Sequence, residues 1–297
     1  MDAARTVDKD RGGSHQVLRE AFELASLRAS IAAWVELLKH GHGFVLVRDF
    51  PVDELSERQT ELAYLGLGLQ MGVPVSQNAA GDVLGHVRDE GVERIDPSVR
   101  LYQTRQRQDF HTDGADIVGL LCLQPSGSGG ESRIASSATV YNRILMERPD
   151  LLEVLYAPMP WDRNDEEPEG EEPFFSLPVV SDVDGIPRIF FIGWYIRDAQ
   201  RHSGAPRLTS PQNEAIELIE RIANDPSVYL EMDFRPGDIQ WLANDRILHS
   251  REAYEDDPAR RRHLLRLWLA ARSFASVDDV LRGGIPLNDG GSARARS

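Results

Sequence analysis

The chain has 297 residues, of which 41% are hydrophobic and 27% charged, so it can bury a substantial core. Its formal net charge of −15 repels phosphate backbones and anionic lipid, which argues against nucleic acid and membranes as partners. The start of the chain lacks the apolar core of a signal peptide, no stretch is long enough to span a bilayer, and Cys122 has no second cysteine to pair with. We therefore expect a cytoplasmic protein that acts on a small molecule, with a homo-oligomer left open.

Three segments have the apolar spacing or the end signals of a helix. The first covers residues 17–40 and is followed by Gly41, a residue type common just after a helix. Ser56 and Gln59 have the spacing of a capping box, which predicts a second helix running through residues 62–70. The third helix is expected over residues 211–224, with a proline in its first turn.

Eight short segments are rich in β-branched, aromatic and aliphatic residues and are expected to be strands. They cover residues 43–50, 99–105, 116–123, 174–180, 188–195, 228–234, 239–244 and 262–270. The tetrapeptides DVDG (182–185) and RPGD (235–238) are typical of turns between strands. Two helices followed by many strands do not give the alternation of a parallel sheet. The order indicates a mainly β fold with flanking helices, an antiparallel sandwich or jelly roll.

We expect one domain over residues 16–289, between disordered polar ends at residues 1–15 and 290–297. Residues 161–173, WDRNDEEPEGEEP, are acidic and contain proline and glycine. This composition favours a solvated surface loop, although a loop of this length can also form a lid over a site.

His111 and Asp113 stand two residues apart, just before the apolar strand expected at 116–123. In an extended chain, side chains two residues apart point to the same side, so both can reach one metal ion. They would supply two of the three ligands of the facial triad of non-haem iron(II) oxygenases. The best second histidine is His249, because it follows the turn at 235–238 and a jelly roll brings early and late strands together. The alternatives are a helix cap or surface hydrogen bond for the first two, and a hydrogen-bonded core residue for His249.

The strand expected at 262–270 carries arginines on one of its faces. Arg262, Leu264, Arg266 and Trp268 alternate with an otherwise apolar face. Buried guanidinium groups need an anion, and no acidic residue lies in this strand. The pattern predicts an anionic ligand, since arginine binds carboxylates through two parallel hydrogen bonds. The alternative is two surface arginines on an edge strand.

Together, H-x-D, a later histidine after a P-G-D turn, and the arginines beyond it resemble the iron(II)/2-oxoglutarate dioxygenases of the taurine dioxygenase (TauD/TfdA) family. The resemblance extends over about residues 40–272. It implies a double-stranded β-helix and the use of Fe(II), 2-oxoglutarate and O2. It also implies that Ser132, in the GGES segment that resembles the family's G-G-[DE]-T, holds the distal carboxylate of 2-oxoglutarate together with Arg262. Arg266 would face the near end of 2-oxoglutarate or the substrate.

The resemblance also implies the reaction. 2-Oxoglutarate would take two positions on the metal and dioxygen the third, and loss of carbon dioxide would give succinate while a hydrogen atom is removed from the substrate. Related halogenases have glycine or alanine in place of the carboxylate ligand. Asp113 therefore predicts hydroxylation, or a desaturation or ring closure that begins with the same hydrogen removal.

Residues 71–82 are comparable to the segment in which the taurine enzyme uses a histidine to help bind its substrate. Gln77 and Asn78 stand here instead, which suits a neutral, hydroxylated or amide-bearing substrate, while Arg266 could anchor a carboxylate. The alternative is that Gln77 and Asn78 only cap a turn. Phe110, Trp241 and Trp268 are candidate pocket walls, with core packing as the alternative for each. Asn244 and Asp245 stand in a region that resembles the family's active-site rim, with no role assigned to them.

Two other functions remain open at this point. HGH (40–42) resembles the H-x-H of zinc-type metal hydrolases, although it follows a helix rather than a strand. A non-catalytic jelly-roll binding protein is the second alternative, and the presence of all three ligands and both arginines argues against it.

Overall fold

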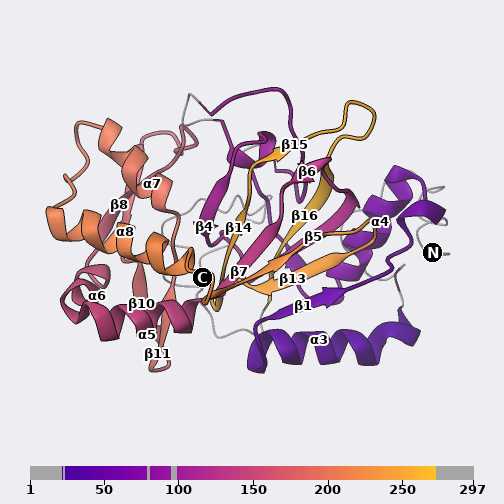
Figure 1. Cartoon of the computed structure of the whole chain (residues 1–297), viewed down its shortest axis with the longest axis horizontal. Helices are drawn as coiled ribbons and strands as arrows, with labels where there is room; N and C mark the ends of the chain where they lie inside the picture. Colours follow the sequence, from indigo (N-terminus) through magenta and orange to yellow (C-terminus); the bar gives the residue numbers. More distant parts are fainter. Residues whose placement is uncertain (1–21, 23, 79–80, 95–98, 272–297) are drawn as a thin grey trace, which may run out of the picture.

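The structure is a computed structural model that describes residues 22, 24–78, 81–94 and 99–271. Two antiparallel sheets form its centre, and helices cover both flanks (Figure 1). The predicted jelly roll with flanking helices is confirmed. The polar ends expected at 1–15 and 290–297, and the expected domain limits, lie outside the described residues.

The larger sheet has the strand order β1-β13-β5-β16-β2, and β3 also pairs with β16. Its members are β1 (Phe44–Val47), β2 (Val73–Pro74), β3 (Leu84–Val87), β5 (Ile117–Gln124), β13 (Ile239–Ala243) and β16 (His263–Ala270). Alternation along β16 sends Leu265, Leu267 and Leu269 into an apolar core on the outer side of the sheet. The arginine-bearing face of β16 therefore points inward, as predicted.

The smaller sheet has the order β12-β7-β14-β4. Its members are β4 (Gln108–His111), β7 (Ser132–Ser136), β12 (Tyr229–Met232) and β14 (Ile247–Arg251). Val118 and Leu242 of the larger sheet pack against Ile134 and Ile247 of the smaller one, which joins the two layers. Three short pairs complete the strands: β6 (Ser128–Gly129) with β15 (Tyr254–Glu255), β8 (Met159–Asp162) with β9 (Phe174–Leu177), and β10 (Val180–Val183) with β11 (Ile186–Ile189).

The helices divide between the two flanks. They are α3 (Arg28–His40), α4 (Glu57–Gly68), α5 (Ser137–Glu147), α6 (Pro149–Leu155), α7 (Gly193–Asp198) and α8 (Ser210–Ala223), with short 3-10 turns η1 (Ala25–Leu27), η2 (Val52–Glu54), η3 (Leu101–Gln103) and η4 (Ala199–Arg201). α3 and α4 lie beside the larger sheet, and α5 to α8 lie beyond the smaller one (Figure 1). The capping box of Ser56 and Gln59 is confirmed, with both reciprocal hydrogen bonds present.

Two expected strands are wrong in part. Within residues 99–105, Leu101–Gln103 form the 3-10 turn η3, after which the Thr104 hydroxyl and amide both donate to the Leu101 carbonyl. No strand in the described part of the chain forms a ladder with this segment. The segment 188–195 leaves its strand at Ile189, and α7 begins at Gly193. This segment is a continuous apolar run, which has no period that separates a strand from a buried helix.

Two further boundaries differ from expectation. In the described part of the first helix, α3 begins only at Arg28, after η1, and residues 17–21 and 23 of the expected helix lie outside the described residues. The acidic segment 161–173 is not wholly a surface loop, because Trp161 and Asp162 are fully buried members of β8.

Candidate active site

Two histidines distant in the sequence face each other in the smaller sheet. His249 on β14 is the register partner of His111 at the end of β4, and their ring centroids lie 4.2 Å apart. The Asp109 carbonyl oxygen lies 2.8 Å from Nδ1 of His111 and can only accept, so Nδ1 carries the proton and Nε2 keeps its lone pair. The amide nitrogen of Gln108 donates toward that lone pair at 3.0 Å. The expected proximity of His111 and His249 is confirmed.

The carboxylate of Asp113 lies close to both imidazoles. Its Oδ1 lies 3.7 Å from Nε2 of His111, and its Oδ2 lies 3.5 Å from Nε2 of His249. β4 ends at His111, so other contacts than strand pairing hold Asp113 in place. The Asn244 side chain accepts from the Asp113 amide at 2.7 Å and donates to the Asp113 carbonyl at 2.5 Å. Trp268 Nε1 donates to Oδ2 at 2.9 Å, which fixes the carboxylate itself.

The charges of this group suit a cation. Burial and the neighbouring His249 lower the pKa of His111 to about 3, so its imidazole is neutral near pH 7. Burial alone would raise the pKa of Asp113, but the Arg266 guanidinium and the two imidazoles outweigh it and hold that pKa below its usual range. The site thus offers two imidazoles and one carboxylate that is ionised.

The donor set fits an iron(II) ion. One ligand atom from each of His111, Asp113 and His249 lies within 4.8 Å of the others, and all three residues are buried. Two imidazoles and a carboxylate on one side of an ion leave positions open for other ligands, as in non-haem iron oxygenases. Among the described residues, neither His40 nor His42 belongs to a group of three side chains that could hold a metal ion. The geometry therefore does not support the hydrolase alternative.

A buried hollow behind the triad is rich in guanidinium groups. It is lined by Ser132, His249, Arg251, Arg262 and Arg266, among others. Arg262 is 3% exposed, its Nη1 has no hydrogen-bond partner among the described residues, and burial lowers its pKa. Gly130, with φ of +78°, lets the turn before β7 pass close by, because a Cβ there would lie 3.2 Å from Nε of Arg262. The expectation that Arg262 and Arg266 are buried is confirmed.

Arg251 is a member of this hollow that the sequence analysis missed. It is 6% exposed, and its Nε and Nη1 have no hydrogen-bond partner in the part of the chain that the structure describes. Burial and the nearby Arg262 lower its pKa to about 10. Arg251 is the register partner of Ser132 and stands two residues after His249, so all three side chains share one face. The H-x-R spacing at 249–251 was the available signal.

A second, larger pocket lies on the other side of the triad. It holds about 900 Å³, counting the space open to solvent, and both His111 and Asp113 line it. Arg266 borders both pockets. The Arg266 guanidinium lies 4.6 Å from the ring centroids of both Tyr102 and Trp268, and its Nε donates to Oε1 of Gln77 at 2.7 Å. Trp268 is thus a pocket wall, as expected.

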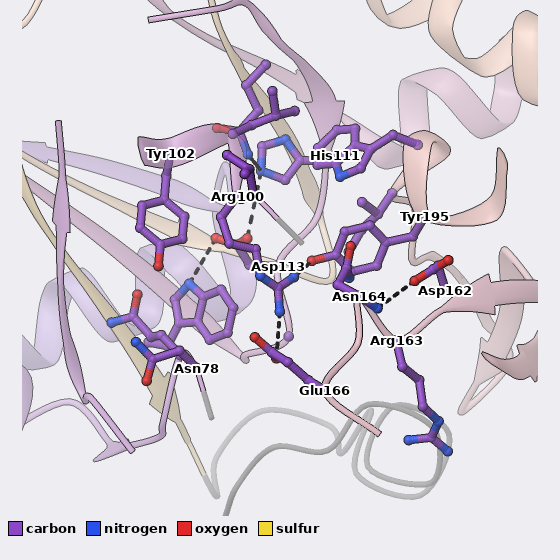
Figure 2. A pocket seen from close by; sticks show the side chains of 18 of the residues that line it. Asn78, Arg100, Tyr102, His111, Asp113, Asp162, Arg163, Asn164, Glu166 and Tyr195 are labelled. Carbon is purple, nitrogen blue, oxygen red and sulfur yellow. Dashed lines mark hydrogen bonds and ion pairs between the residues drawn. The ribbon is translucent and has the colours of Figure 1, made fainter. Parts of the chain in front are cut away.

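The outer wall of this pocket comes from loops. Arg100 pairs with Glu166 at 2.6 Å and with the Tyr195 hydroxyl, and Figure 2 shows these side chains beside Asp113. Glu166 belongs to the acidic segment, so part of that segment does border the pocket. Arg163 also lines the pocket, but its guanidinium points away from the other labelled groups (Figure 2) and pairs with Glu171 at 2.8 Å. Sequence patterns gave no signal for these loop contacts.

The amides expected to face the substrate line the larger pocket, but their polar atoms are engaged. Gln77 donates to the carbonyls of Val83 and Arg266 at 3.0 and 2.9 Å. Asn78 exchanges hydrogen bonds with Asp82 at 2.9 and 3.1 Å, which is the turn-capping alternative. Direct contact with substrate stays a prediction.

Three other candidates have structural surroundings. Trp241 packs in the core outside the larger sheet, with its ring 5.6 Å from that of Tyr64. Phe110 belongs to the core between the smaller sheet and α5 to α8. Asp245 pairs with Arg188 at 3.0 Å.

No helix in the described part of the chain is both long and apolar enough to cross a membrane.

Comparisons with known proteins agree with this geometry. The model of the taurine catabolism dioxygenase TauD, TfdA family matches residues 11–268. FR-33289 synthase of Streptomyces rubellomurinus is 32% identical over 278 residues, which cover 91% of this chain and 81% of that protein. The taurine hydroxylase-like protein SAT17 of Stachybotrys chartarum is 30% identical, over 96% of this chain and 74% of that protein.

Solved structures show the same fold. Asparagine oxygenase in complex with Fe(II), 3-hydroxyasparagine and succinate superposes with a TM-score of 0.70, at 16% identity, over 90% of this chain and 89% of that chain. This likeness supports the double-stranded β-helix. Because the family model matches most of its length, the chain belongs to the TauD/TfdA family and is an iron(II)- and 2-oxoglutarate-dependent dioxygenase.

Proposed function

We propose that His111, Asp113 and His249 hold the iron(II) ion of this dioxygenase, through Nε2 of each imidazole and the aspartate carboxylate. The observation that carries the assignment is the convergence of three buried ligand atoms within 4.8 Å. The Asp109 carbonyl supports it, because it leaves Nε2 of His111 as the lone-pair atom. Asn244 and Trp268 act as positioning residues, since they hold the backbone and the carboxylate of Asp113.

The cofactors supply the oxidation: one dioxygen converts 2-oxoglutarate to succinate and carbon dioxide and oxidises one carbon–hydrogen bond of the substrate. The chain's own contribution is placement and the exclusion of water. The ring of Trp194 lies 5.1 Å from that of His111, and Trp268 covers Asp113. Because Asp113 keeps its carboxylate in the ligand set, the outcome is hydroxylation, or a desaturation or cyclisation.

The buried hollow behind the triad suits the distal carboxylate of 2-oxoglutarate. Arg262, Arg251 and the hydroxyl of Ser132 line it, and both guanidinium groups have buried N–H groups without partners. Two buried cations without a counter-ion are costly, and a carboxylate that accepts from both removes much of that cost. Ser132 Oγ contacts the Gln240 amide at 3.2 Å, so its hydroxyl is oriented before the ligand binds.

The larger pocket suits a small polar substrate with at least one anionic group. Arg266 lines it beside the triad, and its guanidinium is oriented by Gln77 and held between two aromatic rings. Arg100 and Glu166 pair with each other at the outer wall and add little net charge, so Arg266 is the group that favours a carboxylate-bearing molecule, such as an amino acid. The structure of the asparagine oxygenase, which has the same fold, contains 3-hydroxyasparagine, and a bound amino acid in that protein supports this class.

Succinate release with iron(II), 2-oxoglutarate and a panel of compounds tests the substrate class. The panel contains amino acids, other organic acids, neutral alcohols and amides, and taurine. We expect a carboxylate-bearing compound to raise succinate release above the uncoupled rate, and Arg266→Leu to remove that stimulation. Stimulation by neutral compounds alone, unchanged in Arg266→Leu, would contradict the proposal.

The single cysteine, Cys122, which is buried and has no second cysteine to pair with, favours a reducing compartment, and we propose a cytoplasmic location. Fractionation of cells that express the chain tests this. Recovery with the membrane or secreted fraction would contradict it.

A further inference from the structure

A second group of metal-ligating side chains lies away from the triad. It consists of Glu57 at the start of α4, His86 on β3 and His263 at the start of β16, and is termed the Glu57 cluster below. One ligand atom from each residue lies within 4.8 Å of the others. None of the three lines either active-site pocket.

The sheet builds this cluster. His86 is the register partner of Leu265, and His263 stands two residues before Leu265, so both imidazoles leave the same face of the sheet. That face is opposite to the one that carries Arg262 and Arg266. Nδ1 of His86 and Nε2 of His263 lie 2.8 Å apart, so the two imidazole nitrogens face each other. In this hydrogen bond one nitrogen carries the proton and the other presents its lone pair.

α4 supplies the acidic side of the cluster. Glu57 is its first residue, and Glu61 follows one turn later on the same side of the helix. Oε1 of Glu61 lies 3.7 Å from Nε2 of His86, the nitrogen that faces away from His263. A carboxylate beside the outer nitrogen of a histidine favours the proton there and leaves the other nitrogen free to bind a metal.

We propose that Glu57, His86 and His263 form a second metal site that binds Zn²⁺. Two imidazoles, one carboxylate and a water match the ligand preference of zinc, with Glu61 as the outer contact of His86. Zn–N bonds of about 2.0–2.1 Å hold two nitrogens about 3.3 Å apart, so the rings must separate by about half an ångström. His263 then carries its proton on Nδ1 instead of Nε2, by exchange with water, so that two metal–nitrogen bonds replace the hydrogen bond between the rings.

Its place in the fold makes this a structural site rather than a catalytic one. The bound ion would join the start of α4 to β3 and β16, two paired strands that α4 otherwise meets through the apolar core. The side chains of His86 and Glu61 are 34% and 28% exposed, so the ion can exchange with solution. Zinc should therefore raise the unfolding temperature without entering the reaction.

The test is zinc binding by the full-length chain, with the triad removed as a competing site. In the His111→Ala/His249→Ala background, titration calorimetry and metal content after dialysis should give one Zn²⁺ per chain. Adding His86→Ala should weaken binding at least 30-fold, and adding Glu57→Gln about 10-fold. His42→Ala is the matched control, because His42 is an exposed histidine outside the cluster, and it should leave binding unchanged.

The wild-type chain provides a second measurement if the background variant does not fold. It should bind two Zn²⁺ ions, and His86→Ala should bind one. Absence of zinc binding in the folded background variant, or the same affinity after His86→Ala, would overturn the proposal. Such a result would leave the iron assignment untouched, because the two sites share no residue.

Discussion

His111 and His249 are direct register partners on β4 and β14, with ring centroids 4.2 Å apart. This pairing exists because the jelly roll places an early strand beside a late one in the smaller sheet. Asp113 completes the group from the residues just after β4, where Asn244 holds its backbone. The proposed metal site therefore depends on the end of β4, the middle of β14 and the two hydrogen bonds from the Asn244 side chain.

Asp113→Ala should abolish 2-oxoglutarate turnover with the fold retained, because it removes the anionic ligand and leaves two imidazoles. Succinate release and circular dichroism check this. Asp109→Ala is the matched control, since its side chain is exposed and its backbone carbonyl still orients His111. Wild-type turnover in Asp113→Ala would show that the triad is assigned wrongly.

Arg262→Leu should raise the KM for 2-oxoglutarate far more than Ser132→Ala. Loss of a charge-assisted bidentate contact in a buried site costs roughly 3 kcal/mol or more, which is over 100-fold, whereas one hydroxyl contributes about 1 kcal/mol, or about fivefold. Arg261→Leu controls for charge, because Arg261 is the exposed neighbour. An unchanged KM in Arg262→Leu would refute the role of this arginine.

Arg251→Gln should weaken 2-oxoglutarate binding by about 10-fold or more, because it removes one of the two guanidinium groups proposed to hold the distal carboxylate. Arg251 also bonds to the carbonyls of Leu101 and Gln106, so a purely structural role must be separated. Anaerobic binding of 2-oxopentanoate, which lacks the distal carboxylate, provides that separation. A contact to the distal carboxylate weakens 2-oxoglutarate alone, and equal weakening of both keto acids would contradict it.

Wild-type enzyme should give no chlorinated product in chloride buffer, because Asp113 occupies the ligand position that chloride needs. Mass spectrometry of the products of an active substrate checks this, with a mass gain of one oxygen or a loss of two hydrogens expected. A product that carries chlorine would contradict the role of Asp113.

Taurine should not raise succinate release above the uncoupled rate. Gln77 and Asn78 replace the histidine of the taurine enzyme, and their amides are directed to the protein rather than to the pocket. Arg100 is paired with Glu166, so it adds little net positive charge for a sulfonate. Strong stimulation by taurine would instead identify a sulfonate-oxidising enzyme.

The features predicted correctly from the sequence are those that follow from the two-residue alternation of side chains along a strand. Alternation along residues 262–270 placed Arg262 and Arg266 on the inner face and the leucines in the core, as the structure has them. The same-side argument for His111 and Asp113 reached the right neighbours, although contacts to Asn244 and Trp268 hold Asp113 rather than strand pairing.

The missed features depend on contacts between distant segments. Residues 99–105 have a strand-like composition but find no partner strand, and a local turn forms instead. Arg100 and Glu166 lie outside any helix or strand and meet only after folding. Arg251 was within reach of the sequence, because it stands two residues after His249 on the same strand face.

Anaerobic addition of 2-oxoglutarate to the iron(II)-loaded protein tests the central assignment most directly. We expect a weak visible charge-transfer band that saturates at one equivalent of iron in the wild type and in Asp109→Ala. The band should be lost in Asp113→Ala and His249→Ala, and Arg262→Leu should require much more 2-oxoglutarate to produce it. A wild type without the band, or an undiminished band in both ligand variants, would contradict the assignment of the iron ligands.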